Sequence, residues 1–222
     1  MEIRTAFHKQ LKIIQDDLLM MGSMTEKAIT QSIKALKERD IELAQQIIEN
    51  DKKINQTRFE IEEKCIKLIA TQQPMAGDLR NLIAVLNIIS EVERIGDHAE
   101  GNAKIVIMIG DEPPLKPLID IPRMAEKTVN MLHRSLDSFI QRNIDDAKQI
   151  ATEDDEVDEL YNQVFRELLV FMAEDPKTIT RATRLIWVAH NLERSADRVT
   201  NICERIVYMV TGKMEEIGVS KY

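Results

Sequence analysis

The chain has 222 residues, and its 44% apolar and 31% charged residues are typical of a soluble globular protein. Seven glycines, six prolines and only 4% aromatic residues leave few helix breakers and little preference for strands, so long helices are favoured. The formal net charge of −8 argues against binding to nucleic acid, which needs a basic surface.

Six long helices are predicted from the spacing of apolar residues and the positions of the prolines. The first half of the chain predicts helices over about 3–38, 41–72 and 79–108, with Pro74 in the turn before the third. Four prolines within GDEPPLKPLIDIP (110–122) predict a linker, because proline lacks a backbone donor and clashes with the preceding turn of a helix. The second half predicts helices over about 122–142, 144–173 and 178–211, and Pro176 precedes the last of them.

The two halves of the chain also resemble each other in sequence. The pattern Glu-Arg-x-x-Asp at 93–97 recurs at 193–197, and MTEKA (24–28) is matched by MAEKT (124–128). Recurrence at matching places in two helical units indicates duplication. We therefore expect an all-α fold of two pseudo-symmetric three-helix bundles, at 1–110 and 123–222, joined by a linker at 111–122.

The cellular compartment is predicted from the lack of a recognisable signal peptide, membrane span or disulfide framework. The opening MEIRTAFHKQLKII is not typical of a signal peptide, and apolar runs stay far below the ~20 residues of a membrane span. Cys65 and Cys203 have no zinc-like spacing and no disulfide framework, which favours a reducing compartment. We expect a cytoplasmic protein with at most peripheral membrane association.

Several acidic residues fall on the apolar seams along which these helices should pack. Asp51 lies on the seam of the second predicted helix, and Asp154 lies at the matching place in the second half. Two antiparallel helices joined by a short turn bring residues side by side when their numbers are symmetric about that turn. Symmetry about Pro74, and about the point between Asp175 and Pro176, then predicts four facing pairs: Asp51 with Asp97, Asn55 with Glu93, Asp154 with Asp197, and Asp158 with Glu193.

Carboxylates gathered in a helical interface repel one another unless something neutralises them. Protonation could do so, and so could arginines, of which Arg58, Arg94 and Arg194 are near in sequence. A bound cation is the third possibility, and an all-oxygen ligand set suits Mg²⁺, Ca²⁺, Mn²⁺ or iron. The sequence leaves the choice between a metal and an arginine network open.

The stretches that carry these acids resemble a known family. QQPMAGDLRNLIAVLNIISEVERIGDHAEGNA (72–103) is similar to the signature helix hairpin of the PhoU family of phosphate-transport regulators. FHKQLKIIQDDLLMMGSMTEKAI (7–29) is similar to the first helix of that family, and NLERSADRVTNICERIVYMVTG (191–212) to its repeated motif. The resemblance implies two three-helix bundles with pseudo-twofold symmetry that bind multinuclear clusters of iron or another transition metal.

The resemblance also implies which residues would bind the metal. Glu93 and Asp97 match the family motif in the first repeat, and Glu193 and Asp197 match it in the second. Asp51, Asp154 and Asp158 match the acids of the facing helices less closely. After its aspartate the first repeat departs from the second, because Asn102 lies one place later than the corresponding Asn201.

By the same resemblance the function is regulatory rather than enzymatic. Such proteins lie at the cytoplasmic side of the phosphate ABC transporter, couple it to a sensor histidine kinase and repress phosphate-starvation genes. We also expect a homodimer. The sequence contains no Gly-rich phosphate loop and no nucleophile motif.

Two other classes of protein are alternatives to this interpretation. A di-iron carboxylate bundle needs Glu three residues before His, but the residues three before its four histidines are Thr5, Ile95, Asn130 and Trp187. A metal-free helical scaffold is the simpler alternative.

Overall fold

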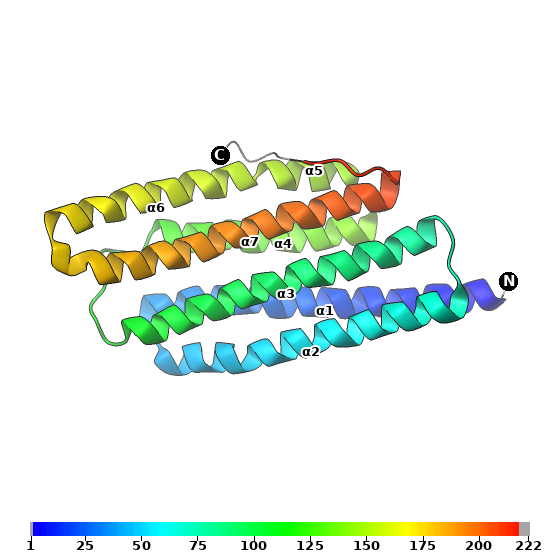
Figure 1. Ribbon diagram of the computed structural model, residues 1–222, viewed down its shortest axis with the longest axis horizontal. Coiled ribbons are helices and arrows are strands. Elements are labelled where there is room, and N and C mark those ends of the chain that lie inside the picture. Colours follow the sequence, from blue (N-terminus) through cyan, green and yellow to red (C-terminus); the bar gives the residue numbers. More distant parts are fainter. Residues whose placement is uncertain (1, 218–222) are drawn as a thin grey trace.

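The fold is entirely helical over the part of the chain that the structure describes. This computed structural model describes residues 2–217, so residue 1 of the first predicted half and residues 218–222 of the second lie outside it. Within each half, long helices that follow one another in the chain run antiparallel along the long axis (Figure 1). The elements are α1 (Glu2–Glu38), α2 (Ile41–Gln72), α3 (Gly77–Ile109), α4 (Asp120–Gln141), α5 (Ile144–Thr152), α6 (Asp154–Glu174), the short 3₁₀ helix η1 (Pro176–Thr178) and α7 (Ile179–Thr211).

The helices form two layers (Figure 1). One layer has the order α2, α3, α7 and α6, and the other contains α1 and α4. Helix α1 packs on α2 and α3, whereas α4 packs on α6 and α7, so each half of the chain is a three-helix unit. The predicted all-α fold with an internal repeat is confirmed. In residues 2–217 no helix combines the length and the apolar character that a membrane crossing needs.

Local sequence signals explain where several helices begin and end. Asp40 caps α2 by accepting a hydrogen bond from the backbone N–H of Leu43 at 2.8 Å, and Asn143 caps α5 in the same way. Helix α7 ends at Gly212, whose φ of 74° suits a residue without a Cβ, and its N–H bonds to the Tyr208 carbonyl. Pro122 lies inside the first turn of α4, where proline is tolerated because that N–H has no partner within the helix.

The fifth predicted helix is interrupted at Glu153, which separates α5 from α6. The Glu153 N–H bonds to the Ile150 carbonyl, and the Glu156 N–H bonds to the Glu153 carbonyl, so the backbone tightens there into turns of three residues. The Arg134 guanidinium on α4 binds the Glu153 carboxylate at 2.8 Å and the Asp146 carboxylate at 2.6 Å. This arginine therefore holds α5 and the interruption itself against α4.

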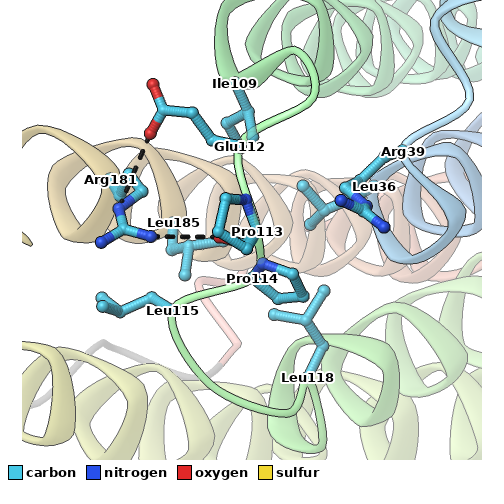
Figure 2. A pocket seen from close by; sticks show the side chains of 10 residues that line it. All are labelled: Leu36, Arg39, Ile109, Glu112, Pro113, Pro114, Leu115, Leu118, Arg181 and Leu185. Atoms are coloured by element: carbon cyan, nitrogen blue, oxygen red, sulfur yellow. Dashed lines mark hydrogen bonds and ion pairs between the residues drawn. The ribbon is translucent and has the colours of Figure 1, made fainter.

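The Pro-rich linker is fixed against the ends of three helices (Figure 2). Arg181 on α7 donates to the Pro113 carbonyl at 3.1 Å and lies 3.6 Å from the Glu112 carboxylate. Leu115 and Leu118 of the linker line a small cavity together with Leu36 of α1 and other apolar residues. Its volume of about 30 Å³ can hold a water molecule but is far below that of a small-molecule site.

The two halves share one continuous core and meet most extensively between α3 and α7. Asn191 of α7 donates to the side-chain oxygen of Asn102 at 2.9 Å, and Arg198 donates to Glu91 at 3.4 Å. In the other layer Gly22 of α1 packs directly on Leu136 of α4, where an added Cβ would overlap the Leu136 Cδ1 atom. Close contact at both layers makes the two units one body.

Gly22→Val should test the contact between α1 and α4. We expect the free energy of unfolding to fall by about 1–3 kcal/mol, because the new side chain overlaps the buried Leu136. In the double variant with Leu136→Ala the two losses should be less than additive, since valine occupies the vacated space. Urea unfolding of the four chains measures this coupling, and additive losses would show that Leu136 is not the limiting neighbour.

Candidate functional site

The first group of acids lies where α2 packs against α3, and we call this acidic helix contact the first groove. Asp51 of α2 is only 8% exposed, and its Oδ2 accepts a hydrogen bond from Asn55 at 2.9 Å. Its Oδ1 accepts no hydrogen bond from the described residues and faces Gly96 of α3, where an added Cβ would lie 3.5 Å away. The absence of a side chain at Gly96 therefore leaves room for the carboxylate between the helices.

Burial and three acids of α3 together raise the pKa of Asp51. Burial raises the pKa of Asp51 to about 6, and Asp97, Glu100 and Glu93 add to the increase, while the Asn55 hydrogen bond opposes it. The pKa values of Glu93 and of the more exposed Asp97 are also raised, first by burial and then by neighbouring carboxylates. The predicted convergence of Asp51, Glu93 and Asp97 is thus present in the structure.

The second group of acids lies at the equivalent contact between α6 and α7, which we call the second groove. Burial, followed by Asp197, Asp158 and Glu193, raises the pKa of Asp154 to about 7. Burial, followed by Asp197 and Asp158, likewise raises the pKa of Glu193 to about 7. The pKa values of Asp158 and Asp197 are raised as well, mainly by burial. All four acids predicted for the second half are brought together.

The fourth carboxylate comes from α3 in the first group and from α6 in the second. In the first half Asn55 takes the place that Asp158 has in the second half, and Glu100 of α3 acts on both Asp51 and Asp97. The residue of α7 that corresponds to Glu100 is Thr200. Sequence reasoning missed Glu100, although its position one turn beyond Asp97 on the same helix could have pointed to it.

Arginines neutralise only part of these groups. Arg194 binds Asp197 at 2.6 Å, whereas the ion pairs formed by Arg58 and Arg94 are with Glu62 and Glu91, outside the predicted acids. Asp154 Oδ1 accepts no hydrogen bond within residues 2–217, and neither does Glu193 Oε2, although His190 Nδ1 lies 3.3 Å from the latter. Arg58 and Arg94 lower the pKa of Glu93, and Lys104 and Arg94 lower that of Asp97, but these effects do not cancel the increase. Among the predicted acids, only Asp197 forms an ion pair with an arginine within residues 2–217.

The donor chemistry of the two groups fits a hard or borderline cation. Carboxylate oxygens with no hydrogen-bond donor, held where burial raises their pKa, would gain from a positive ion between them. Among the described residues, however, no three His, Cys, Asp or Glu side chains already stand in an arrangement that could hold an ion. Binding would therefore require these side chains to move toward one another.

Asn102 does not belong to the first group of acids. It is buried in the contact between α3 and α7, where its side-chain oxygen accepts from Asn191. Its displacement by one residue relative to Asn201 thus affects the contact between the halves rather than the acids.

A duplicated helical bundle with one acidic groove in each half defines the class of this protein. The family model described as "PhoU domain" matches it twice, at residues 18–106 and 121–206. The chain belongs to the PhoU domain family.

Comparisons with individual proteins extend this similarity over nearly the full length. The chain is 40% identical to a "Phosphate-specific transport system accessory protein PhoU homolog" of Clostridium acetobutylicum, covering 97% of this chain and 99% of that protein. It is 35% identical to the Escherichia coli protein named "Phosphate-specific transport system accessory protein PhoU", covering 93% and 86%. The crystal structure of the phosphate transport system regulatory protein PhoU from Streptococcus pneumoniae matches with a TM-score of 0.89 at 31% identity, covering 95% and 100%.

The stability of the metal-free protein should depend on pH through the second group of acids. Because the pKa values of Asp154 and Glu193 rise to about 7 on folding, the folded chain binds more protons than the unfolded chain between about pH 4 and pH 7. The contribution of these acids to the free energy of unfolding is therefore greatest below pH 4 and is lost as the pH rises through 7.

Urea unfolding of metal-free protein across this pH range measures the effect. The free energy of unfolding of the Asp154→Asn, Glu193→Gln double variant should decline less with pH than that of the native chain. Glu159→Gln, which changes an exposed acid of the same α6, should leave the native profile unchanged. Parallel profiles for the native chain and the double variant would contradict the assignment.

Proposed function

We propose that this chain is a non-enzymatic accessory protein that regulates phosphate uptake and phosphate signalling. The observation that carries the proposal is its similarity, over nearly the whole chain, to proteins named as accessory or regulatory proteins of phosphate transport. In this role it acts at the cytoplasmic side of a phosphate ABC transporter and couples that transporter to a sensor histidine kinase. The outcome is repression of phosphate-starvation genes when phosphate is plentiful.

We further propose that the two acidic grooves bind cations, as a multinuclear cluster of iron or another divalent transition metal. Asp51, Glu93 and Asp97 would provide oxygen ligands in the first half, with Glu100 beside them. In the second half the ligands would be Asp154, Asp158, Glu193 and Asp197. Such a cation would supply positive charge that reduces the repulsion between the carboxylates, and the paired grooves would hold α2 to α3 and α6 to α7 more firmly.

One observation favours a second candidate, a metal-free scaffold of the same transport system. The carboxylates of the described residues do not stand in a preformed coordination geometry. Protonation, which the raised pKa values of Asp51, Asp154 and Glu193 make easier, would then relieve part of the repulsion. Metal content decides between the two candidates.

Purified native protein, reconstituted anaerobically with Fe²⁺ or Mn²⁺, should retain metal after desalting and gain thermal stability. The Asp154→Asn, Glu193→Gln variant should lose about half of the bound metal, because one of two grooves is disabled. Elemental analysis and thermal unfolding provide the two readouts, and Glu159→Gln is the matched control. Native protein that retains no metal and gains no stability would favour the scaffold.

Deletion of the gene in its host should cause phosphate-starvation genes to be expressed in phosphate-rich medium. A plasmid copy of the native gene should restore repression, which a reporter fused to a phosphate-responsive promoter measures. Normal switching in the deletion strain would overturn the regulatory proposal whatever the metal content.

A further inference from the structure

An exposed strip of aromatic and apolar side chains crosses the outer side of α6 and α7, next to the second group of acids. We define the aromatic strip as Tyr161, Phe165 and Leu169 of α6 with Trp187 and His190 of α7. The Tyr161 ring centroid lies 6.0 Å from that of His190 and 6.2 Å from that of Phe165, so the two helices contribute to one surface. Trp187 precedes His190 by one helical turn, and Leu169 follows Phe165 by one turn.

The strip leaves large apolar side chains in contact with water. Phe165 is 36% exposed, Leu169 is 44% exposed, and Trp187, the single tryptophan of the chain, is 50% exposed. Exposed apolar side chains that occur singly need no explanation, but a contiguous group of this kind marks an interaction site. Tryptophan and tyrosine are also the residues that most often dominate the binding energy of protein interfaces.

The fold itself does not require the aromatic side chains of the strip, because their equivalents in the first half are polar. Only Leu169 has an apolar equivalent, Ile66 of α2, which is 56% exposed. The seams of α2 and α6 align Arg58 with Tyr161 and Glu62 with Phe165, and the repeated motif aligns Asn87 with Trp187. Arg58 and Glu62 form an ion pair at 3.5 Å in that place. The same backbone thus carries polar side chains in one half at the positions where the other half has Tyr161, Phe165 and Trp187.

Negative charge borders the strip on one side. Glu193 lies close enough to Tyr161 to help raise the pKa of its phenol, after burial, and Glu193 belongs to the second group of acids. A ligand that fits this surface needs apolar anchors for the rings and positive charge for the carboxylates.

We propose that the aromatic strip binds an amphipathic helix of a partner protein, in which Lys or Arg side chains flank apolar anchors. A helix lying along α6 and α7 would place residues of successive turns on the rings and its basic residues at Glu193 and Asp158. A second copy of this chain is disfavoured as the occupant, because two such surfaces face to face would bring their acidic groups together. An anionic lipid surface is disfavoured for the same reason. The proposal goes beyond the accessory function proposed above by assigning it a contact surface and a partner chemistry.

Photo-crosslinking in living cells tests where the surface binds. The crosslinking amino acid benzoylphenylalanine replaces Phe165 in one strain and Phe59 in another, both being ring for ring substitutions. Phe59 is 57% exposed on α2 and serves as the matched control in the first half. Mass spectrometry should identify, from Phe165 alone, a segment of another protein with a helical apolar pattern and Lys or Arg beside the anchors. Crosslinks from Phe165 to a second copy, to lipid or to nothing would overturn the proposal, as would the same product from Phe59.

A synthetic peptide of the crosslinked segment then tests the chemistry of binding in solution. Binding should shift the emission of Trp187, the sole tryptophan, to shorter wavelength as the indole leaves water. The affinity of the labelled peptide should fall about tenfold or more with Phe165→Ala or Trp187→Gln, and when its own Lys and Arg are replaced by Gln. Phe59→Ala should leave the affinity unchanged, and circular dichroism should show that each variant is folded.

Equal affinity of all these variants and peptides would overturn the proposal. The reporter assay for phosphate signalling is independent of this result. Normal switching in the deletion strain would contradict the regulatory proposal but not the binding of a basic helix to the strip. Absence of the crosslink would contradict the binding proposal but not the regulatory one.

Discussion

The repulsion among half-buried carboxylates is the constraint on which the two grooves of this bundle depend. Each groove brings four acids together, and burial raises the pKa values of Asp51, Glu93 and Asp97 in the first and of all four acids in the second. Few of the ion pairs formed by nearby arginines reach these acids. A bundle stabilised only by its core would gain by replacing such residues with apolar ones, because uncompensated burial of charge is costly. Acids at other helix contacts have hydrogen-bond donors: Asp120 of α4 accepts from Arg123 and Gln163, and Glu91 of α3 accepts from Arg198 and Asn201. The cost is thus confined to two equivalent places, as expected for a site that gains its stability from a cation or from protons.

Duplication explains why the grooves are alike and also where they differ. The antiparallel contact of α3 with α7 places the motif of each half on either side of one shared interface. The fourth acid, however, is Glu100 on α3 in one half and Asp158 on α6 in the other. Because the two fourth carboxylates reach their grooves from opposite walls, the grooves are equal in the number of acids but different in shape. The divergence of the aromatic strip from its polar counterpart follows the same pattern on the surface.

The parts of the structure that were predictable from sequence are those governed by helical repetition. A constant rise per residue and a short turn are enough to predict the pairing of Asp51 with Asp97 and of Asp154 with Asp197. The interruption at Glu153 was missed because the apolar spacing continues through it from Ile150 to Val157, and the Arg134 guanidinium that binds Glu153 lies on another helix, α4. Glu100 was missed because it lies beyond the repeated motif, and its counterpart is a threonine. Whether metal occupies the grooves depends on side-chain movement that neither helical spacing nor the observed geometry determines.

The two proposals are linked through Glu193, which belongs to the second acidic groove and also borders the aromatic strip. A cation bound in that groove would reduce the negative charge that a basic helix meets, and the helix would in turn weaken the attraction of the groove for the cation. Such coupling is reciprocal, so each ligand changes the affinity of the other by the same factor. The first groove has no equivalent strip, because Arg58 and Glu62 occupy that place as an ion pair. Metal binding would therefore change the affinity for a partner helix through the second half of the chain. Metal in the first groove would chiefly affect the stability of the α2–α3 hairpin.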